Sequence, residues 1–219
     1  MRVALGVEYD GSAFRGWQTQ PGGNTVQDAL EAALQQIAGV PVEVVCAGRT
    51  DAGVHATGQV VHFDPPVSRP LTAWVRGVNT FLPDAVAVRW VHPVGADFHA
   101  RFSAFGRCYR YVLINRPQRP GVWHGRAGWY HHPLDVDAMQ RGASLLLGEH
   151  DFSAFRAAGC QAKSPVKTVR RAEVRRVGPV TPARVAASSS PCSASSCARI
   201  SSSAARPWAG RTVSPVSAK

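Results

Sequence analysis

Arg49, Asp51, Gly53 and His55 lie in the segment AGRTDAGVHATGQVVH (residues 47–62), which joins two apolar stretches. The Arg49 guanidinium is close enough along the chain to hold the Asp51 carboxylate ionised through charge and hydrogen bonding. Gly53 permits a positive φ, so the connection can turn sharply and push Asp51 outward. An exposed carboxylate that stays anionic in basic surroundings can act as a covalent nucleophile or as a positioned base.

The same residues have a simpler interpretation as a surface turn. The sequence Thr-Asp-Ala-Gly at residues 50–53 is good turn chemistry. An arginine and an aspartate two positions apart often form only a solvated ion pair. Physical reasoning from these residue types alone favours this second interpretation.

The segment GRTDAGVHATGQVVHF closely resembles the signature of the tRNA pseudouridine synthase A family. The resemblance spans roughly residues 1–180 and implies the pseudouridine synthase fold. It also implies a cofactor-free isomerisation of uridine to pseudouridine in the anticodon stem-loop, at positions 38 to 40 of tRNA. The family's nucleophilic aspartate falls on Asp51, and attack on the base or on the ribose stays open.

A second segment, YDGSAFRGWQTQ, resembles the first motif of the same family. It follows an expected strand and belongs to a long connection rich in glycine and proline. Arg15, Gln18 and Gln20 supply a charge and two amides, which suit a phosphate backbone and exposed bases. We therefore expect these three residues to bind RNA, whereas Phe14 and Trp17 are at least as well explained as anchors into the core.

The segment GRCYRY matches the family pattern Arg-x-Tyr-x-Tyr at Tyr109. The resemblance makes Tyr109 the candidate for stacking on uracil, with a hydroxyl suited to proton transfer. The alternative is that Tyr109 and Tyr111 only fill a strand, because tyrosine favours β-structure. The arginines proposed to contact phosphate or substrate, each of which could instead be a solvated charge, are Arg49, Arg101, Arg107 and Arg110.

The histidines also have both functional and structural interpretations. His55 is a candidate RNA ligand, and the alternative is a turn fixed by a bond from its ring to a backbone carbonyl. His131 and His132 suggest a metal site, but adjacent residues of a strand point to opposite faces, so no metal site is predicted. His150 and Asp151 are interpreted as groups that fix a loop.

Hydrophobic periodicity predicts the elements that position Asp51. Residues 2–9 alternate as a strand, and Val26, Leu30 and Leu34 lie on one face of a helix for which Asn24 is the expected cap. Strands at 42–48 and 58–64, a short helix at 71–78 and a strand at 86–90 complete the order βαββαβ. This order predicts an α+β, ferredoxin-like unit over residues 1–95, with Asp51 in a loop at one end of its sheet.

Residues 96–180 repeat this plan incompletely. A strand at 107–114, a helix starting near Asp135 and a strand at 169–177 are expected, and further elements are lacking. Residues 181–219 are rich in serine and alanine without an apolar period, so we expect disorder there and hypothesise a shifted or truncated reading frame after about Val180. The resemblance implies that the missing part carries the arginine that pairs with the aspartate, and contributes to a homodimer.

Composition limits the class of protein. A chain of 219 residues that is 45% hydrophobic can bury a core in one large or two small domains, and its formal charge of +11 predicts a polyanionic partner, here tRNA. The first residues are too polar for a signal peptide, and no stretch approaches a membrane span. Five cysteines without a CxxC pair indicate neither zinc nor a disulfide framework, so a cytoplasmic location is expected.

Three functions remain open at this stage. The first is a tRNA pseudouridine synthase, which needs no cofactor. The second is a catalytically impaired, RNA-binding remnant of that family. The third is a ferredoxin-like domain with another partner, in which the Asp51 segment is only a turn.

Overall fold

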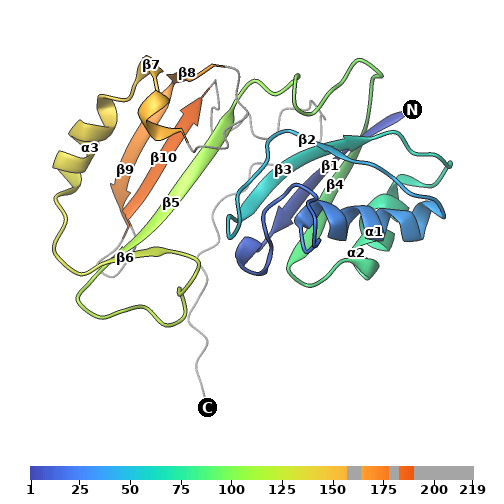
Figure 1. Ribbon diagram of the computed structural model, residues 1–219, viewed down its shortest axis with the longest axis horizontal. Helices are drawn as coiled ribbons and strands as arrows, with labels where there is room; N and C mark the ends of the chain where they lie inside the picture. The colour runs from blue at the N-terminus through green and yellow to red at the C-terminus, as the bar shows by residue number, and fades with distance from the viewer. Residues whose placement is uncertain (157–163, 178–182, 190–219) are drawn as a thin grey trace.

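The computed structural model describes residues 1–156, 164–177 and 183–189, the last of these as backbone alone. These residues form a mixed α+β structure whose two larger sheets lie beside each other (Figure 1). The α+β class predicted from the sequence is confirmed. No helix among the described residues is long and apolar enough to cross a membrane.

The first sheet has the strand order β2-β3-β1-β4, and all neighbouring strands are antiparallel. Strand β1 lies between β3 and β4, so Leu5 pairs with Val61 on one side and with Val91 on the other. Because both of its edges are hydrogen-bonded, β1 is the centre of this sheet. The strands are β1 (Arg2–Tyr9), β2 (Val45–Cys46), β3 (Ala56–Phe63) and β4 (Val86–Val94).

Helices cover one face of the first sheet (Figure 1). Val3, Leu5 and Val7 of β1 are fully buried in a core that also contains Trp17 and Trp74. The predicted strand at residues 42–48 is shorter than expected, although Val42 and Val44 still enter this core. The helical elements of this part are η1 (Gly11–Ala13), α1 (Val26–Ala38), η2 (Ala73–Gly77) and α2 (Val78–Phe81).

The N-terminal cap of α1 lies one residue later than the sequence predicts. Thr25 Oγ1 accepts from Asp28 N at 3.2 Å, and Asp28 Oδ2 accepts from Thr25 N at 3.2 Å, which forms a capping box. Asn24 instead has a φ of 61° and donates from its side chain to Ala13 O at 2.8 Å. Asn24 is therefore used to turn the preceding loop, because asparagine tolerates the left-handed region better than threonine does.

The second sheet has the order β6-β5-β10-β9. Strand β10 is antiparallel to β5 and β9, whereas β6 pairs with β5 in parallel only from Leu113 to Asn115. Helix α3 packs on β9 through a small cluster in which Ala143, Ala172 and Val174 are buried. The strands and helix are β5 (Arg107–Asn115), β6 (Gly128–Tyr130), α3 (Val136–Ser144), β9 (Arg171–Arg176) and β10 (Ala183–Ser189).

Strand β10 departs from the disorder predicted for residues 181–219. Its main chain pairs with Arg107–Leu113 of β5 and Arg171–Arg176 of β9. A strand needs ladder hydrogen bonds from the backbone and not a strict apolar period, so a serine- and alanine-rich stretch can occupy it. The prediction is thus wrong for residues 183–189, and the rest of that range lies outside the described residues.

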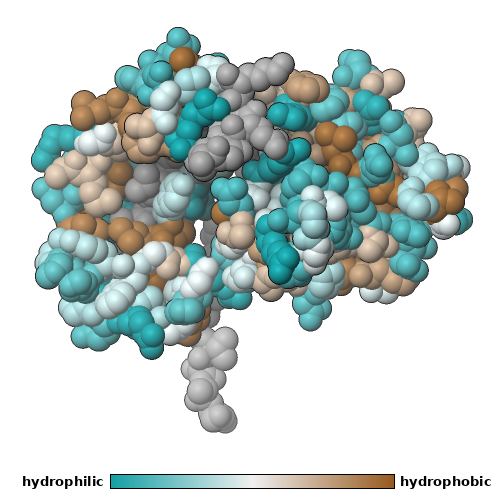
Figure 2. All heavy atoms as spheres, viewed as in Figure 1, coloured by the Kyte–Doolittle hydropathy of each residue, from teal (hydrophilic) through white to brown (hydrophobic). Residues whose placement is uncertain are grey.

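A small separate sheet pairs β7 (Gly148–Asp151) with β8 (Val166–Val169), and η3 (Ser153–Phe155) follows β7. His150 Nε2 lies 2.8 Å from Leu147 O, and Asp151 Oδ1 accepts from Ser153 N at 2.7 Å. These bonds confirm that both residues fix local turns, although they lie in a short strand and not in a loop. Figure 2 shows hydrophobic side chains gathered near the end of α3, where Leu145, Leu146 and Leu147 are exposed.

Candidate catalytic site

Asp51 lies in the loop between β2 and β3, and its side chain is exposed. The backbone turns immediately after it, because Val54 N donates to Asp51 O at 3.2 Å. Gly53 has a φ of 77°, as its predicted role in the turn requires. The loop therefore presents the carboxylate to solvent at the end of the first sheet, where the sequence places it.

The segment that follows β1 supports this loop from one side. Trp17 N donates to Thr50 O at 2.9 Å, and Gly53 N donates to Phe14 O at 3.4 Å. The side chain of Trp17 is 1% exposed, so the core-anchor interpretation holds for this residue. The two segments whose sequences resemble one family are thus packed against each other.

Gly16 makes this packing possible. Its φ is 98°, and a Cβ atom at this position would lie 2.7 Å from Thr50 O. Any larger residue would be strained and would push the two segments apart. The residue before Asp51 is also held by its side chain, since Tyr9 Oη lies 2.8 Å from Thr50 Oγ1. Burial raises the pKa of the Tyr9 phenol, which keeps it protonated and able to donate.

Two side chains hold the start of the loop. Gln59 Nε2 donates to Gly48 O at 2.5 Å, and Arg107 Nη2 donates to Ala47 O at 2.6 Å. Arg107 comes from β5 and so joins the second sheet to the loop that carries Asp51. Its side chain runs so close to Gly48 that a Cβ atom there would lie 2.9 Å from Arg107 Nε. The backbone before Asp51 is therefore fixed from both sheets.

Asp10 connects the end of the loop to residues beyond β5. Its Oδ1 lies 3.0 Å from His55 Nδ1, and its Oδ2 lies 2.9 Å from Arg126 Nη2. Hydrogen bonds from Ser12, together with the nearby charges of His55 and Arg126, lower the pKa of Asp10 to about 2. Asp10 is thus an anion under ordinary conditions and attracts both neighbours.

His55 bonds to backbone groups on both sides of its ring. Gly11 N donates to Nδ1 at 3.3 Å, and Nε2 lies 3.3 Å from Gly125 O. A neutral ring with its proton on Nε2 satisfies both contacts, whereas a protonated ring donates to Asp10 from Nδ1. This geometry supports the turn-fixing alternative for His55, and its predicted contact with RNA stays a prediction.

Comparison with known proteins shows which family this chain resembles. A family model described as tRNA pseudouridine synthase matches residues 6–103 and 143–200. The chain is 73% identical over 178 residues to tRNA pseudouridine synthase A of Dechloromonas aromatica (strain RCB). This alignment covers 81% of this chain and 68% of the relative. The chain belongs to the tRNA pseudouridine synthase family. The family model extends to residue 200, whereas the alignment with this relative covers 178 residues, close to the span of about 180 residues predicted from the sequence.

Other members of the family are nearly as similar. The chain is 62% identical over 178 residues to tRNA pseudouridine synthase A of Paracidovorax citrulli (strain AAC00-1), covering 81% of this chain and 64% of the relative. It is 61% identical over 178 residues to the protein of the same description from Thiobacillus denitrificans (strain ATCC 25259 / T1), covering 81% and 68%. The chain therefore spans about two thirds of the length of these pseudouridine synthases.

Most of the other residues of the first part that were predicted to bind RNA or substrate are exposed. Arg49 is exposed, and its charge opposes the burial that raises the pKa of the Cys46 thiol. Arg15 and Gln20 are exposed, and Gln20 Nε2 donates to Arg15 O at 2.9 Å, which shapes their own loop. Gln18 is half-buried.

Strand β5 carries the remaining predicted ligands of the pseudouridine synthase site. Tyr109 is 48% exposed and lies on the same face of β5 as Arg107, whereas Arg110 is exposed on the other face. Arg101, before this strand, is exposed and lies 5.8 Å from the centre of the Phe102 ring. Strand alternation therefore separates Arg110 from the pair formed by Arg107 and Tyr109.

Sequence reasoning missed three residues that hold the pseudouridine synthase loop. Asp10 is part of the recognised YDGS motif, and its position at the end of a strand is the signal that could have indicated it. Gln59 alternates within β3, and its inward position could be inferred from that period. Arg126 lies in a glycine-rich connection far along the chain, and no local pattern marks it.

His131 and His132 were predicted to lie on opposite faces of a strand, and the structure differs. They follow β6 and do not lie within it, and their ring centres are 4.0 Å apart. Their side chains therefore do not point to opposite faces, because strand alternation ends at Tyr130. Across the described residues, no group of three or more histidine, cysteine, aspartate or glutamate side chains is placed to hold a metal.

A pocket of about 460 Å³ lies at the other end of β3 and is lined by Arg2, His62 and His99, among others. His62 is buried, and its Nδ1 accepts from Ala100 N at 3.1 Å. Burial and the Arg2 charge lower the pKa of His62, so this ring is neutral near pH 7. Because Asp51 precedes β3 and His62 is near its end, the pocket is separate from the candidate catalytic site.

Proposed function

We propose that this protein isomerises uridine to pseudouridine in the anticodon stem-loop of tRNA, at positions 38 to 40, with Asp51 as the nucleophile. One observation carries the proposal: Asp51 is exposed, while the backbone on both sides of it is hydrogen-bonded to the segment after β1, to β3 and to β5. A nucleophile in a fixed position loses less entropy on reaction than one in a free loop. Membership of the tRNA pseudouridine synthase family supplies the reaction.

The reaction breaks the N1–C1′ bond of uridine and forms a C5–C1′ bond, while a proton leaves C5 and another is bound at N1. Asp51 attacks either the base or the ribose carbon, which keeps the two fragments in the site while the uracil turns. A uridine in a stacked stem must first be extruded from the helix. Tyr109 supports the extruded base by stacking, and Arg49 contacts the substrate.

The other predicted ligands divide into two roles under this proposal. Arg15, Gln18, Arg101 and Arg110 contact the RNA backbone or exposed bases. Gln20, His55 and Arg107 have backbone partners within the protein, so we assign them first to holding the loops of the site. Gln20 and Arg107 have further donors for the predicted RNA contacts, whereas both ring nitrogens of His55 already have partners within the protein.

We further propose that both parts of the chain derive from a ferredoxin-like plan. The order β2-β3-β1 of the first sheet has a counterpart in β9-β10-β5 of the second. Along the chain, α1 lies between β1 and β2, and α3 lies between β5 and β9. The domain limits at residues 1–95 and 96–180 are part of this proposal. A homodimer and a cytoplasmic location are proposed from the family alone.

A second candidate function is RNA binding without turnover. It is supported by the coverage of the relatives, since the alignments include 64% to 68% of their length. The resemblance also implies that the arginine that pairs with the aspartate belongs to a C-terminal family motif that residues 181–219 do not match. Both candidates predict tRNA binding, and only the first predicts release of the C5 proton.

The test is tritium release from tRNA labelled at uracil carbon 5. We expect the full chain to release tritium, and Asp51→Asn to reduce release by at least about 10³-fold, because an amide is not a nucleophile for this step. Asp84→Asn is the matched control, since Asp84 is an exposed carboxylate in another loop. Equal release by wild type and Asp51→Asn would contradict the assignment, and no release by wild type with intact tRNA binding would favour the second candidate.

A further inference from the structure

The segment at residues 116–132 combines cations with aromatic rings and contains no aspartate or glutamate. It begins after β5, includes β6 and ends before α3. None of the residues predicted to bind RNA lies in it. Its chemistry-bearing members are Arg116, Arg119, Trp123, His124, Arg126, Trp129, Tyr130, His131 and His132.

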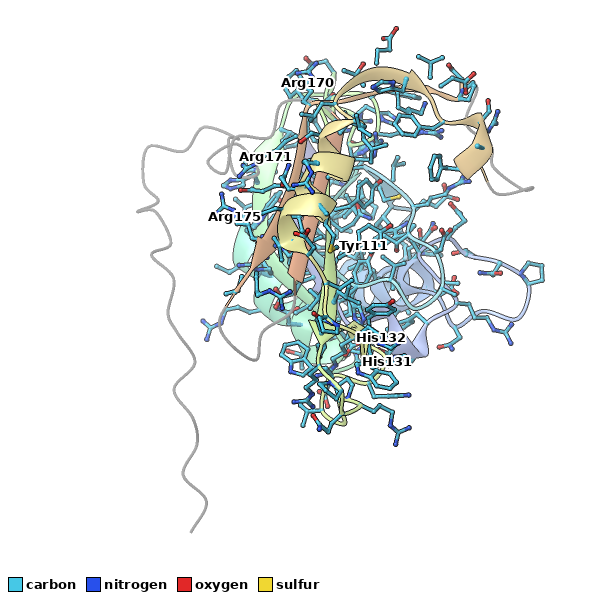
Figure 3. All side chains as sticks on the ribbon, turned by 90° about the vertical axis from the view of Figure 1, so that its left-hand side faces the viewer. Tyr111, His131, His132, Arg170, Arg171 and Arg175 are labelled. Carbon is cyan, nitrogen blue, oxygen red and sulfur yellow. The ribbon has the colours of Figure 1, made fainter. Side chains whose placement is uncertain are left out.

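The large aromatic side chains of this segment are open to solvent. Trp123 is 49% exposed, and Trp129 and Tyr130 are each 42% exposed. The rings continue into the two histidines, since Tyr130 and His131 have centres 5.7 Å apart. Figure 3 shows His131 and His132 at the lower end of the second sheet, at the opposite end from Arg170. The segment thus displays several ring faces that the described residues leave partly uncovered.

Hydrogen bonds fix the backbone that carries these rings. Asn115 Nδ2 donates to Tyr130 O at 3.0 Å and to His132 O at 2.5 Å. Trp129 Nε1 donates to Arg116 O at 2.9 Å, which ties the two ends of the segment together. The Trp129 ring and the backbone of Tyr130 and His132 are therefore held in place before any ligand arrives, which reduces the entropic cost of binding.

The same segment contacts the loop of Asp51. Arg126 Nη2 lies 2.9 Å from Asp10 Oδ2, and Gly125 O lies 3.3 Å from His55 Nε2. Trp123 belongs to the same turn, because its carbonyl accepts from Arg126 N at 3.0 Å. Trp123 therefore lies two residues from Gly125, whose carbonyl oxygen contacts His55 at the end of the β2–β3 loop.

We infer that residues 116–132 form a second RNA-binding surface, which holds unpaired nucleotides of the anticodon loop beside Asp51. The inference rests on the proposed function. Ring faces stack on bases without regard to sequence, and arginines neutralise phosphates. The segment contains no carboxylates, which would repel a polyanion. Its composition therefore favours a polyanion over a protein partner. Trp123 stacks on a base, and Arg119 contacts a phosphate.

The test measures binding of an anticodon stem-loop transcript to the full chain by fluorescence anisotropy at several salt concentrations. Trp123→Ala is expected to weaken binding by about tenfold, because stacking on an aromatic ring contributes about that factor per base. Trp123→Phe keeps a ring face and is expected to retain most of the affinity. Arg119→Ala is expected to reduce the salt slope by about 0.7 to 1, the value for one lost phosphate contact.

Two matched controls lie on the helices of the first part. Phe81→Ala removes a ring that is 53% exposed on α2, and Arg76→Ala removes an exposed cation on η2. Neither should change affinity beyond twofold. If the segment variants bind like the controls, the inference is overturned even when tritium release is normal. If they lose binding while the wild-type chain releases no tritium, the inference stands and the proposed isomerase activity fails.

Discussion

At the scale of single residues, the proposed nucleophile is distinct from the groups that hold its loop. Asp51 points to solvent, whereas its neighbour Thr50 is bonded through both its carbonyl and its hydroxyl. Arg107 illustrates the difference between residue type and role. An arginine in a basic protein suggests a phosphate contact, but one of its nitrogens is bound to Ala47 O.

Arg107→Ala is expected to lower kcat for pseudouridine formation by about tenfold or more and to change tRNA affinity less. The loss follows because the loop before Asp51 is released from β5, and small displacements of a catalytic group cost much of its rate. Steady-state kinetics on tRNA, together with anisotropy for affinity, provide the measurement.

Arg110→Ala is the matched control on the opposite face of the same strand. It is expected to weaken tRNA binding with a smaller salt slope and to leave kcat near the wild-type value. A result in which both variants change only affinity would contradict a positioning role for Arg107. Arg107→Lys provides a further check, because lysine keeps the charge but not the planar geometry of the guanidinium.

At the scale of elements, the site is built where four connections meet. The loop after β1, the β2–β3 loop, the start of β5 and the turn before β6 exchange hydrogen bonds and ion pairs. Asp10 is central to this meeting because it also accepts from Ser12 N at 3.0 Å and so caps η1. Its anionic form stabilises three of the four connections at once.

Asp10→Asn is expected to lower the free energy of unfolding by about 1 kcal/mol at pH 7, after allowance for the partial exposure of the carboxylate. The pKa of Asp10 is depressed in the folded protein to about 2 from its ordinary value of 3.8. Its contribution is therefore fully present above pH 4 and is lost as pH falls from about 4 to 2. Urea unfolding followed by tryptophan fluorescence between pH 7 and pH 3 measures the effect.

The difference between wild type and Asp10→Asn should shrink below pH 4. Asp84→Asn serves as the control, since Asp84 is an exposed carboxylate outside this network. A difference that stays constant over the whole pH range would show that the substitution acts through packing and not through the charge of Asp10.

At the scale of the whole molecule, the two larger sheets are stabilised unequally. The first buries an extended cluster around β1 and two helices, whereas the buried cluster described for the second contains Ala143, Ala172 and Val174. Exposed apolar side chains of the second part include Tyr111 and Leu145, which are 69% and 77% exposed. Burial of apolar surface is the main stabilising contribution, so the first sheet should be the more stable one.

Amide hydrogen exchange is expected to show this inequality. Amides of β1 should exchange slowest, because both edges of the strand are paired and Val3, Leu5 and Val7 are fully buried. Amides of β5 and β9 should exchange faster. Exchange followed by mass spectrometry of peptides from each strand provides the measurement, with α1 as the internal reference for the first part. Equal protection of β1 and β9 would contradict the expected order.

Most of the first sheet follows from local patterns in the sequence. The strand at residues 2–9 and the helix on the stripe of Val26, Leu30 and Leu34 are confirmed, because a single period of burial dominates each segment. The cap of α1 was less accessible, since both Asn24 and Thr25 are residue types that cap helices, and the contact of Asn24 with Ala13 O decides between them. Strand β10 was missed because backbone pairing leaves little trace in its sequence.

The sequence by itself determined the family, the α+β class and the turn that exposes Asp51, because each of these is encoded by residues close together along the chain. Only the tertiary structure decided what holds that turn in place. Arg107, Arg126 and Asp10 meet it through contacts between residues far apart in the sequence. Such contacts arise when the sheets come together, and a local pattern of residue types contains no information about which distant partner will arrive.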